Sequence, residues 1–251
     1  MKRLILFAGL FLSLFTDMIF AKFDSSIYSQ LSFSTTIPIF DVQNINIGRI
    51  RGNNSFSAGV IGNFGHQFVI KDGKYSISLL TELGYYRQTF SESYSYSMNY
   101  LDINIKDNLS FDTLLLGIMP KLNIDLRDLL TSIGIDSKTR MMSIGIGFGM
   151  KIPLGGKSYS YINNIEYDEK ISFNDINRAF TYAVIPYIKF QIDDYFYFSE
   201  YAAFLFGVSI VYDFGIYYDV KQLDAPLSNF MNKYGLSNFE VSLNLGIKFG
   251  K

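Results

Sequence analysis

Large apolar residues alternate with small ones along the segment 142–154. Met, Ile, Phe or Leu holds every second position, and Gly or Ser fills most of the positions between them. A period of two predicts a β-strand. A half-buried strand of a soluble protein usually turns charged side chains toward water, whereas this one offers Gly145, Gly147 and Gly149. We therefore predict a strand of a narrow closed barrel in lipid, with the apolar residues outward and the glycines facing a crowded interior.

Seven other segments alternate in a similar way, so the pattern predicts eight strands. The eight ranges are approximately 27–39, 55–68, 75–85, 109–119, 142–154, 179–192, 195–215 and 238–249. Both faces of 195–215 are rich in apolar residues, which leaves its lipid-facing side open. Residues 71–74 and Asp193-Asp194 predict tight turns, whereas 40–53, 91–108, 155–178 and 216–236 predict long loops. Short periplasmic turns and long extracellular loops are typical of outer-membrane barrels.

One connection departs from this rhythm, because 120–140 is long where a periplasmic turn is expected. Leucines at helical spacing, with Asp125 as a possible N-cap, predict a short helix near 125–133 at the inner interface. An irregular turn whose leucines cover the barrel floor is the alternative.

The first residues predict export from the cytoplasm. Met1-Lys2-Arg3 is basic, and a short apolar run leads to Ala21. This pattern indicates a signal peptide over 1–21, cleaved after Ala21, and a single barrel domain over 22–251. An uncleaved anchor is the alternative, which Asp17 and the shortness of the run disfavour.

The composition narrows the choice of function. The chain is 49% hydrophobic and 17% aromatic, carries a formal net charge of −1 and has no cysteine. No basic surplus favours nucleic acid, and disulfides and thiolate metal sites are excluded. We expect no cofactor. A secreted soluble barrel of the lipocalin kind is the competing architecture, but its outward face would carry more charge than these strands do.

Several charged residues fall on the inward face of the predicted strands. We expect Glu82, Lys151, Lys189 and Glu200 to lie in the lumen, where charges must pair or hydrate. They form either an ion-pair network that fills the barrel or a polar path for small solutes, and we favour the network.

Tyrosines gather at strand ends and in loops. We expect Tyr75, Tyr85, Tyr86, Tyr187 and Tyr195 at the membrane interfaces. Others lie in predicted surface loops, where Tyr, Ser and Asn suit protein binding. The candidate partner-binding residues are Tyr94, Tyr96, Tyr100, Tyr159 and Tyr161. The alternative is that hairpins with alternating Tyr and Ser extend the sheet above the membrane.

The single histidine, His66, is in phase with Phe64 and Phe68 and so faces lipid near the periplasmic rim. We predict no enzymatic activity, because a histidine in that place is favoured as an interfacial residue over a catalytic base.

The last strand carries the most specific resemblance. Asn244, Gly246 and Phe249 resemble the insertion signal that the barrel-assembly machinery reads. With the alternation and loop rhythm, the chain resembles the small outer-membrane barrels of the OmpA-barrel, OmpX and OmpW type. The resemblance implies an all-β, eight-stranded antiparallel up-and-down transmembrane β-barrel in the cell outer membrane, in contact with outer-membrane lipid. It also implies a structural or adhesin-like role, with a host or surface protein as ligand. Transport of small solutes or hydrophobic compounds, as in OmpW, is the alternative.

Overall fold

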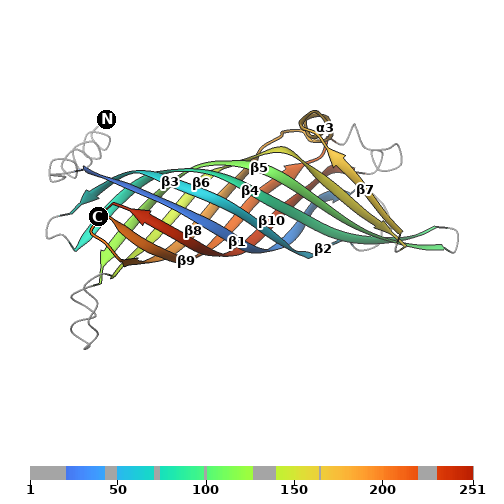
Figure 1. Cartoon of the computed structure of the whole chain (residues 1–251). Coiled ribbons are helices and arrows are strands. Elements are labelled where there is room, and N and C mark those ends of the chain that lie inside the picture. Colours follow the sequence, from blue (N-terminus) through green and yellow to red (C-terminus); the bar gives the residue numbers. More distant parts are fainter. Residues whose placement is uncertain are drawn as a thin grey trace, which may run out of the picture.

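Eight long antiparallel strands close into a ring in the computed structural model of this protein (Figure 1). The structure describes residues 21–42, 50–70, 74–98, 101–126, 140–163, 165–219 and 231–250. The ring strands are β1 (Ala21–Val42), β3 (Asn54–Val69), β4 (Tyr75–Met98), β5 (Leu101–Asp125), β6 (Arg140–Ile162), β8 (Ile185–Tyr197), β9 (Ala202–Tyr217) and β10 (Met231–Phe249). Each pairs with the next in the chain, and this confirms the predicted up-and-down barrel.

The seam of the ring joins the first strand to the last. β1 pairs with β10 from Ser25 opposite Phe249 to Val42 opposite Met231. Closure leaves no ring strand with an open edge, which is what a sheet in lipid requires.

The outer surface is an apolar band. Along every ring strand the odd and even residues alternate between exposed and buried. The exposed set includes Phe33, Phe64, Leu79, Ile118, Phe148, Phe190, Phe206 and Val241, one from each strand. Soluble proteins rarely expose so large a continuous apolar surface to water, so the band faces lipid. The competing architecture, a soluble barrel of the lipocalin kind, does not fit this outer surface.

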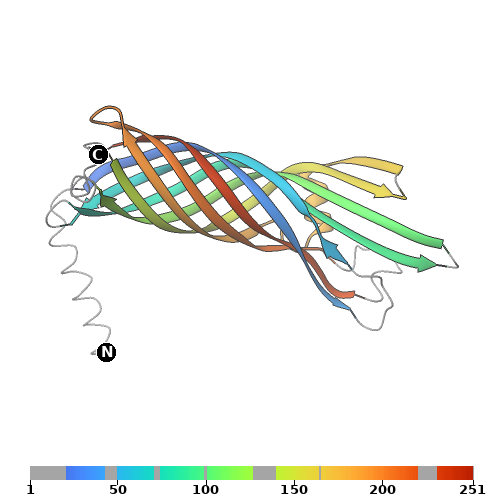
Figure 2. The same ribbon diagram turned by 90° about the horizontal axis from the view of Figure 1, so that it is seen from below.

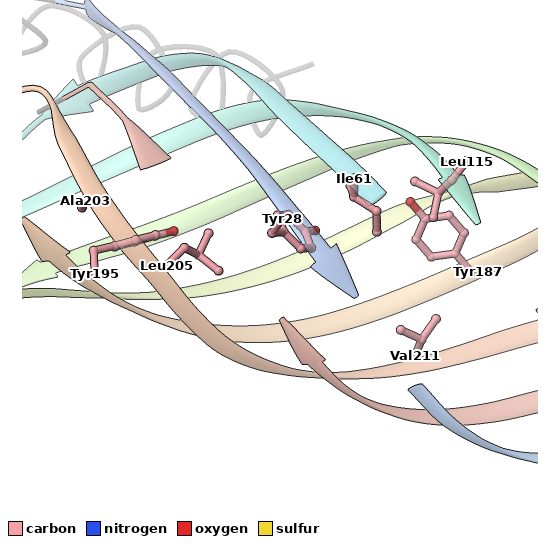
Figure 3. Packing of buried hydrophobic residues seen from close by; sticks show 8 residues of the cluster. All are labelled: Tyr28, Ile61, Leu115, Tyr187, Tyr195, Ala203, Leu205 and Val211. Carbon is pink, nitrogen blue, oxygen red and sulfur yellow. The ribbon is translucent and has the colours of Figure 1, made fainter. Parts of the chain in front are cut away.

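The structure shows which face of β9 meets lipid, a point that the sequence leaves open for 195–215. In β9 the even residues, such as Phe204, are exposed, and the odd residues, such as Leu205, point into the lumen. Figure 3 shows Leu205 there with other buried apolar side chains, among them Tyr28, Leu115 and Tyr187.

The sixth strand begins and ends later than predicted, at Ile185 rather than 179 and at Tyr197 rather than 192. Asp193 and Asp194 lie within β8, opposite Ser143 and Met142 of β6, and the expected turn at these residues is wrong. The bend comes at 198–201 instead. Two adjacent aspartates suit a turn locally, but here Asp193 is held in the strand by a lysine of β5, Lys121.

Two of the predicted long loops are largely β-structure. β4 and β5 stay paired up to Met98 opposite Leu101, and β6 continues to Ile162, where it pairs with β7 (Ile165–Ile171). Figure 2 shows these two hairpins projecting beyond the ring at one end. We take this end as extracellular, since β1 begins and β10 ends at the other. The hairpins therefore extend the sheet beyond the ring, and the described ones among the predicted partner-binding tyrosines of 91–108 and 155–178 belong to paired strands rather than to irregular loops.

A short helix and a two-residue strand complete the extracellular end. α3 (Phe173–Ala179) begins at Ser172, whose side chain and that of Asp175 form a capping box. Its Ile176 is fully buried beside Phe111 and Phe180, in an apolar cluster at the mouth of the barrel. β2 (Arg51–Gly52) pairs with β4.

Some predictions fall outside the described residues. Residues 1–20 of the expected signal peptide and 127–133 of the expected helix are among them. Asp125, the predicted N-cap, is the last residue of β5 and lies opposite Met141. In the described part of the chain, no helix is long and apolar enough to span a membrane.

Candidate functional site

The lumen holds three of the four charged residues that we expected there. Glu82, Lys151 and Lys189 are fully buried inside the ring. Glu200 is not, and its expected place in the lumen is wrong. It lies exposed in the bend between β8 and β9, because β8 ends at Tyr197.

A first ion pair occupies the middle of the lumen. The Lys189 ammonium contacts Glu82 Oε1. The hydroxyls of Tyr28 and Tyr187 donate to the two Glu82 oxygens at 3.1 Å and 2.9 Å. The carboxylate is thereby compensated by one cation and two neutral donors from other strands, which a buried charge needs.

Two further pairs toward the periplasmic end were missed by the sequence analysis. Lys121 Nζ lies 2.6 Å from Asp193 Oδ2, and the Lys248 ammonium contacts Asp24 Oδ1. Lys248 could have been found, since it falls on the polar face of the last predicted strand. Asp193 could not, because its local sequence predicts a turn.

The fourth lysine has two acidic partners. Lys151 Nζ lies 3.0 Å from Asp213 Oδ2 and 3.0 Å from Glu240 Oε1. The Tyr86 hydroxyl donates to Glu240 Oε2 at 2.8 Å, and the ammonium lies 4.7 Å from the Tyr86 ring centroid. We refer to Lys151, Asp213, Glu240, Tyr86 and Gln88, which donates to Asp213, as the Lys151 cluster.

These pairs fill the lumen. Every lysine and carboxylate in them has a side chain no more than 2% exposed. Neighbouring glycines make room, as predicted: a Cβ on Gly149 would come within 2.7 Å of Tyr187 Oη, and one on Gly147 within 2.6 Å of Met119 Cε. The lumen is a packed polar core rather than an open channel.

The expected interfacial tyrosines divide into two groups. Tyr75 and Tyr85 are exposed on the outer face. Tyr86, Tyr187 and Tyr195 are buried in the lumen, so their expected place at the interface is wrong. Their hydroxyls serve the ion pairs: Tyr195, for example, donates to Asp193 Oδ2 at 3.2 Å.

The extracellular hairpins form a second polar surface. The register places Arg51, Ser93, Lys106, Tyr161 and Glu166 in one row across β2, β4, β5, β6 and β7. A pocket of 770 Å³ opens along this row. Its lining has two cations, no acid, and otherwise Tyr, Ile, Ser and Asn: Arg51, Ser93, Tyr94, Ser95, Asn104, Ile105, Lys106, Asn108, Tyr161 and Asn163. We call it the hairpin groove.

The candidate partner-binding tyrosines are distributed around this groove. Tyr94 and Tyr161 line it. Tyr159, one position further down the same face as Tyr161, lies opposite Asn108. The Glu166 carboxylate beside Tyr161 raises the pKa of the Tyr161 hydroxyl above its ordinary value. For Tyr96 only the backbone is described, opposite Ile103, and Tyr100 lies outside the described residues.

A further acid, Glu92 of β4, lies at the mouth of the barrel. It lies beyond Tyr85, the last lipid-facing residue of β4, toward the extracellular end. It accepts a hydrogen bond from the Tyr234 hydroxyl of β10. Burial raises the pKa of Glu92 to about 7, against the lowering effect of that hydrogen bond. The Tyr234 ring stacks on Tyr218, with 5.0 Å between centroids.

The remaining predicted residues lie on the wall. Asn244 is buried, Gly246 lies opposite Tyr28 on β1, and Phe249 is exposed toward lipid. His66 is exposed at the periplasmic end, with its ring centroid 6.5 Å from that of Phe23. Among the described residues no group of three or more His, Cys, Asp or Glu side chains is placed to hold a metal ion.

Comparison with known proteins yields similarity of structure alone. No family model and no curated protein matches the chain. OprG from Pseudomonas aeruginosa has 13% identity and a TM-score of 0.35, over 91% of this chain and 95% of that one. Ail of Yersinia pestis, in complex with the heparin analogue sucrose octasulfate, has 9% identity and a TM-score of 0.32, over 91% and 99%.

The outer membrane protease OmpT from Escherichia coli has 10% identity and a TM-score of 0.34, over 92% of this chain and 96% of that one. At these values the likeness says nothing about what this chain binds or does. Its own closed ring, apolar outer band and filled polar lumen are those of an eight-stranded outer-membrane β-barrel.

Proposed function

We propose that this protein is a surface-exposed outer-membrane barrel that binds an extracellular partner through the hairpin groove. The observation that carries the proposal is the continuation of β4, β5 and β6 as paired strands above the lipid-facing band, where they create a pocket of 770 Å³. A paired sheet holds side chains in fixed rows, so it presents a prepared surface rather than a loose loop.

The charge of the groove favours an anionic partner. Arg51 and Lys106 are exposed and belong to the same row; the acid of that row, Glu166, lies at its far end on β7 and is not part of the lining. Tyr94 and Tyr161 add aromatic area with hydroxyl groups, and the asparagines add adaptable hydrogen bonds. The partner is therefore a polar surface, of host or environment, that carries carboxylate, phosphate or sulfate groups.

The state of the lumen does not support the transport alternative. Its charged groups are paired across strands and closed to water, and the mouth above them is filled by Phe111, Phe180 and Ile176. A solute path would require these contacts to separate. We further propose that residues 1–21 are the signal peptide of this barrel and that Asn244, Gly246 and Phe249 are its assembly signal.

Binding to two polymers tests the proposed function. The purified barrel in detergent should retain dextran sulfate and not uncharged dextran. The double variant Arg51→Glu, Lys106→Glu should weaken that binding at least tenfold, because each cation contacts the polyanion directly. Lys170→Glu, an exposed change on β7 outside the groove, is the matched control and should bind as the unchanged protein does. Equal retention of both polymers, or an equal loss in the control, would contradict the proposal.

A further inference from the structure

The buried charges in the lumen do not balance. Below Glu92, the buried charged side chains of the described residues are four lysines and five carboxylates: Lys121, Lys151, Lys189, Lys248, Asp24, Glu82, Asp193, Asp213 and Glu240. Three of the lysines have one acidic partner each. The surplus carboxylate belongs to the Lys151 cluster, where one ammonium serves Asp213 and Glu240 together.

The same cluster contains two polar atoms without a partner. Asp213 Oδ1 and Gln88 Oε1 are both buried and accept no hydrogen bond. They belong to side chains that touch each other, since the Gln88 amide donates to the other Asp213 oxygen. Other buried side-chain atoms of the described residues also lack a partner, such as Gln30 Oε1 and Asn244 Oδ1, but the two in the Lys151 cluster coincide with the surplus negative charge. Buried acceptors left unpaired are costly, and this coincidence indicates that something positive is bound there.

A single proton accounts for both observations. We propose that the Asp213–Glu240 pair holds one proton at neutral pH, located on Oδ1 of Asp213, from which it donates to Gln88 Oε1. The proton removes the surplus charge and gives both unpaired oxygens a partner. A protonated carboxyl has one O–H donor and keeps acceptor capacity, so the hydrogen bonds from Lys151 and Gln88 to Oδ2 remain in place.

A metal ion fits the site less well. Hard cations in proteins take six or more oxygen ligands, and the Lys151 ammonium, 3.0 Å from both acids, would repel a second cation. The other titratable groups of described residues that act on Asp213 are Tyr86 of β4 and Tyr187 of β8. Both are neutral donors to other carboxylates, and neither supplies the missing positive charge.

The proposed proton makes closure of the upper lumen depend on pH. Loss of the proton leaves a net negative charge among β6, β9 and β10 in a place of low dielectric, where it is costly. In alkaline medium we expect water to enter this part of the lumen, while the three balanced ion pairs below it stay closed.

Infrared spectroscopy detects the proton directly. The full-length barrel in detergent at pH 7, in a Glu92→Gln background that removes the acid at the mouth, should show the C=O band of a protonated carboxylic acid. The band should shift in D₂O. Asp213→Asn should abolish it, and Glu240→Gln should abolish it too, because either change removes the surplus carboxylate. Asp193→Asn is the matched control: it changes a buried aspartate that has its own lysine, and the band should persist.

Unfolding in urea gives the second measurement. Asp213→Asn should leave the midpoint at pH 7 unchanged, because the new amide donates where the proton did, and should raise it in alkaline medium. Asp193→Asn should lower the midpoint, since Lys121 loses its partner. Absence of the band from the unchanged protein would overturn the proposal. Persistence of the band in both Asp213→Asn and Glu240→Gln would also overturn it. So would a urea midpoint that rises when Na⁺ or Ca²⁺ is added at constant ionic strength, if the rise occurs in the unchanged protein and not in these variants.

Discussion

At the scale of the residue, the lumen of this barrel is held together by lysines that reach across it. Each ammonium meets a carboxylate from another strand, as Lys121 of β5 meets Asp193 of β8. A buried pair of this kind adds little net stability, but removal of one partner costs about 3–5 kcal/mol because the other charge is left unpaired. The pairs therefore specify which strands face each other more than they strengthen the fold.

Glu92 makes the mouth of the barrel sensitive to pH near neutrality. Its pKa in the folded protein, about 7, lies above the ordinary value of 4.5. The folded state therefore binds the proton more tightly than the unfolded chain, and its stability falls as pH rises from about 4.5 to 7 and is then constant. We expect a lower urea midpoint at pH 8 than at pH 5, with about 1.4 kcal/mol for each unit of pKa shift.

The variant Glu92→Gln should flatten this dependence while keeping an acceptor for the Tyr234 hydroxyl. Glu169→Gln, an exposed change on β7, should leave the slope as it was. If both variants keep the full slope, the dependence arises elsewhere in the chain.

At the scale of the element, the glycines of β6 set how closely strands and side chains can approach. A Cβ on Gly149 would lie 2.8 Å from the backbone Cα of Gly117 on β5, besides its contact with Tyr187 Oη. Backbone cannot move aside as a flexible side chain can, so Gly149→Ala should destabilise the barrel by about 1–3 kcal/mol.

Gly62→Ala on β3 provides the comparison. There the new Cβ would meet only Leu83 O, at 3.7 Å, an ordinary van der Waals contact. Circular dichroism during urea unfolding should show a lower midpoint for the Gly149 variant and a nearly unchanged one for the Gly62 variant. Equal midpoints would mean that the β5–β6 contact is looser than described.

The elements that could be predicted from the sequence are those in which local pattern and environment agree. β10 shows this best, because lipid on one side and the lumen on the other impose a period of two on every residue from Asn238 to Phe249. Asp193-Asp194 was misread, since its role depends on Lys121, about 70 residues away in the chain. The sequence predicts loops where the extracellular hairpins lie, because no lipid selects apolar residues at every second position there. Backbone pairing continues in these hairpins without that pattern.

The candidate site was predicted only in part for the same reason. Alternation places Glu82, Lys151 and Lys189 on the inward face, and that much follows from a single strand. Their partners depend on the shear of the ring, which no single segment encodes. The hairpin groove depends on the register of five strands, so Tyr161 could be proposed as a surface residue but not as a neighbour of Lys106.

At the scale of the whole molecule, a filled lumen predicts an electrically silent barrel. Reconstituted in planar bilayers near neutral pH, the protein should show no steady open level, because both the mouth cluster and the ion pairs lie across any path. The unchanged barrel has no current for Lys189→Ala to abolish. That variant should instead admit brief openings. A steady channel in the unchanged protein that Glu82→Ala or Lys189→Ala abolishes would contradict this expectation.

The seam between β1 and β10 has a consequence for the order of events during biogenesis. β1, which precedes the other ring strands in the chain, is the hydrogen-bonding neighbour of β10, which follows them. Until β10 arrives, β1 has an unsatisfied edge that hydrocarbon cannot solvate. The ring therefore cannot close before β10 is present, so pairing between the first and last ring strands is the step that removes the final open edge.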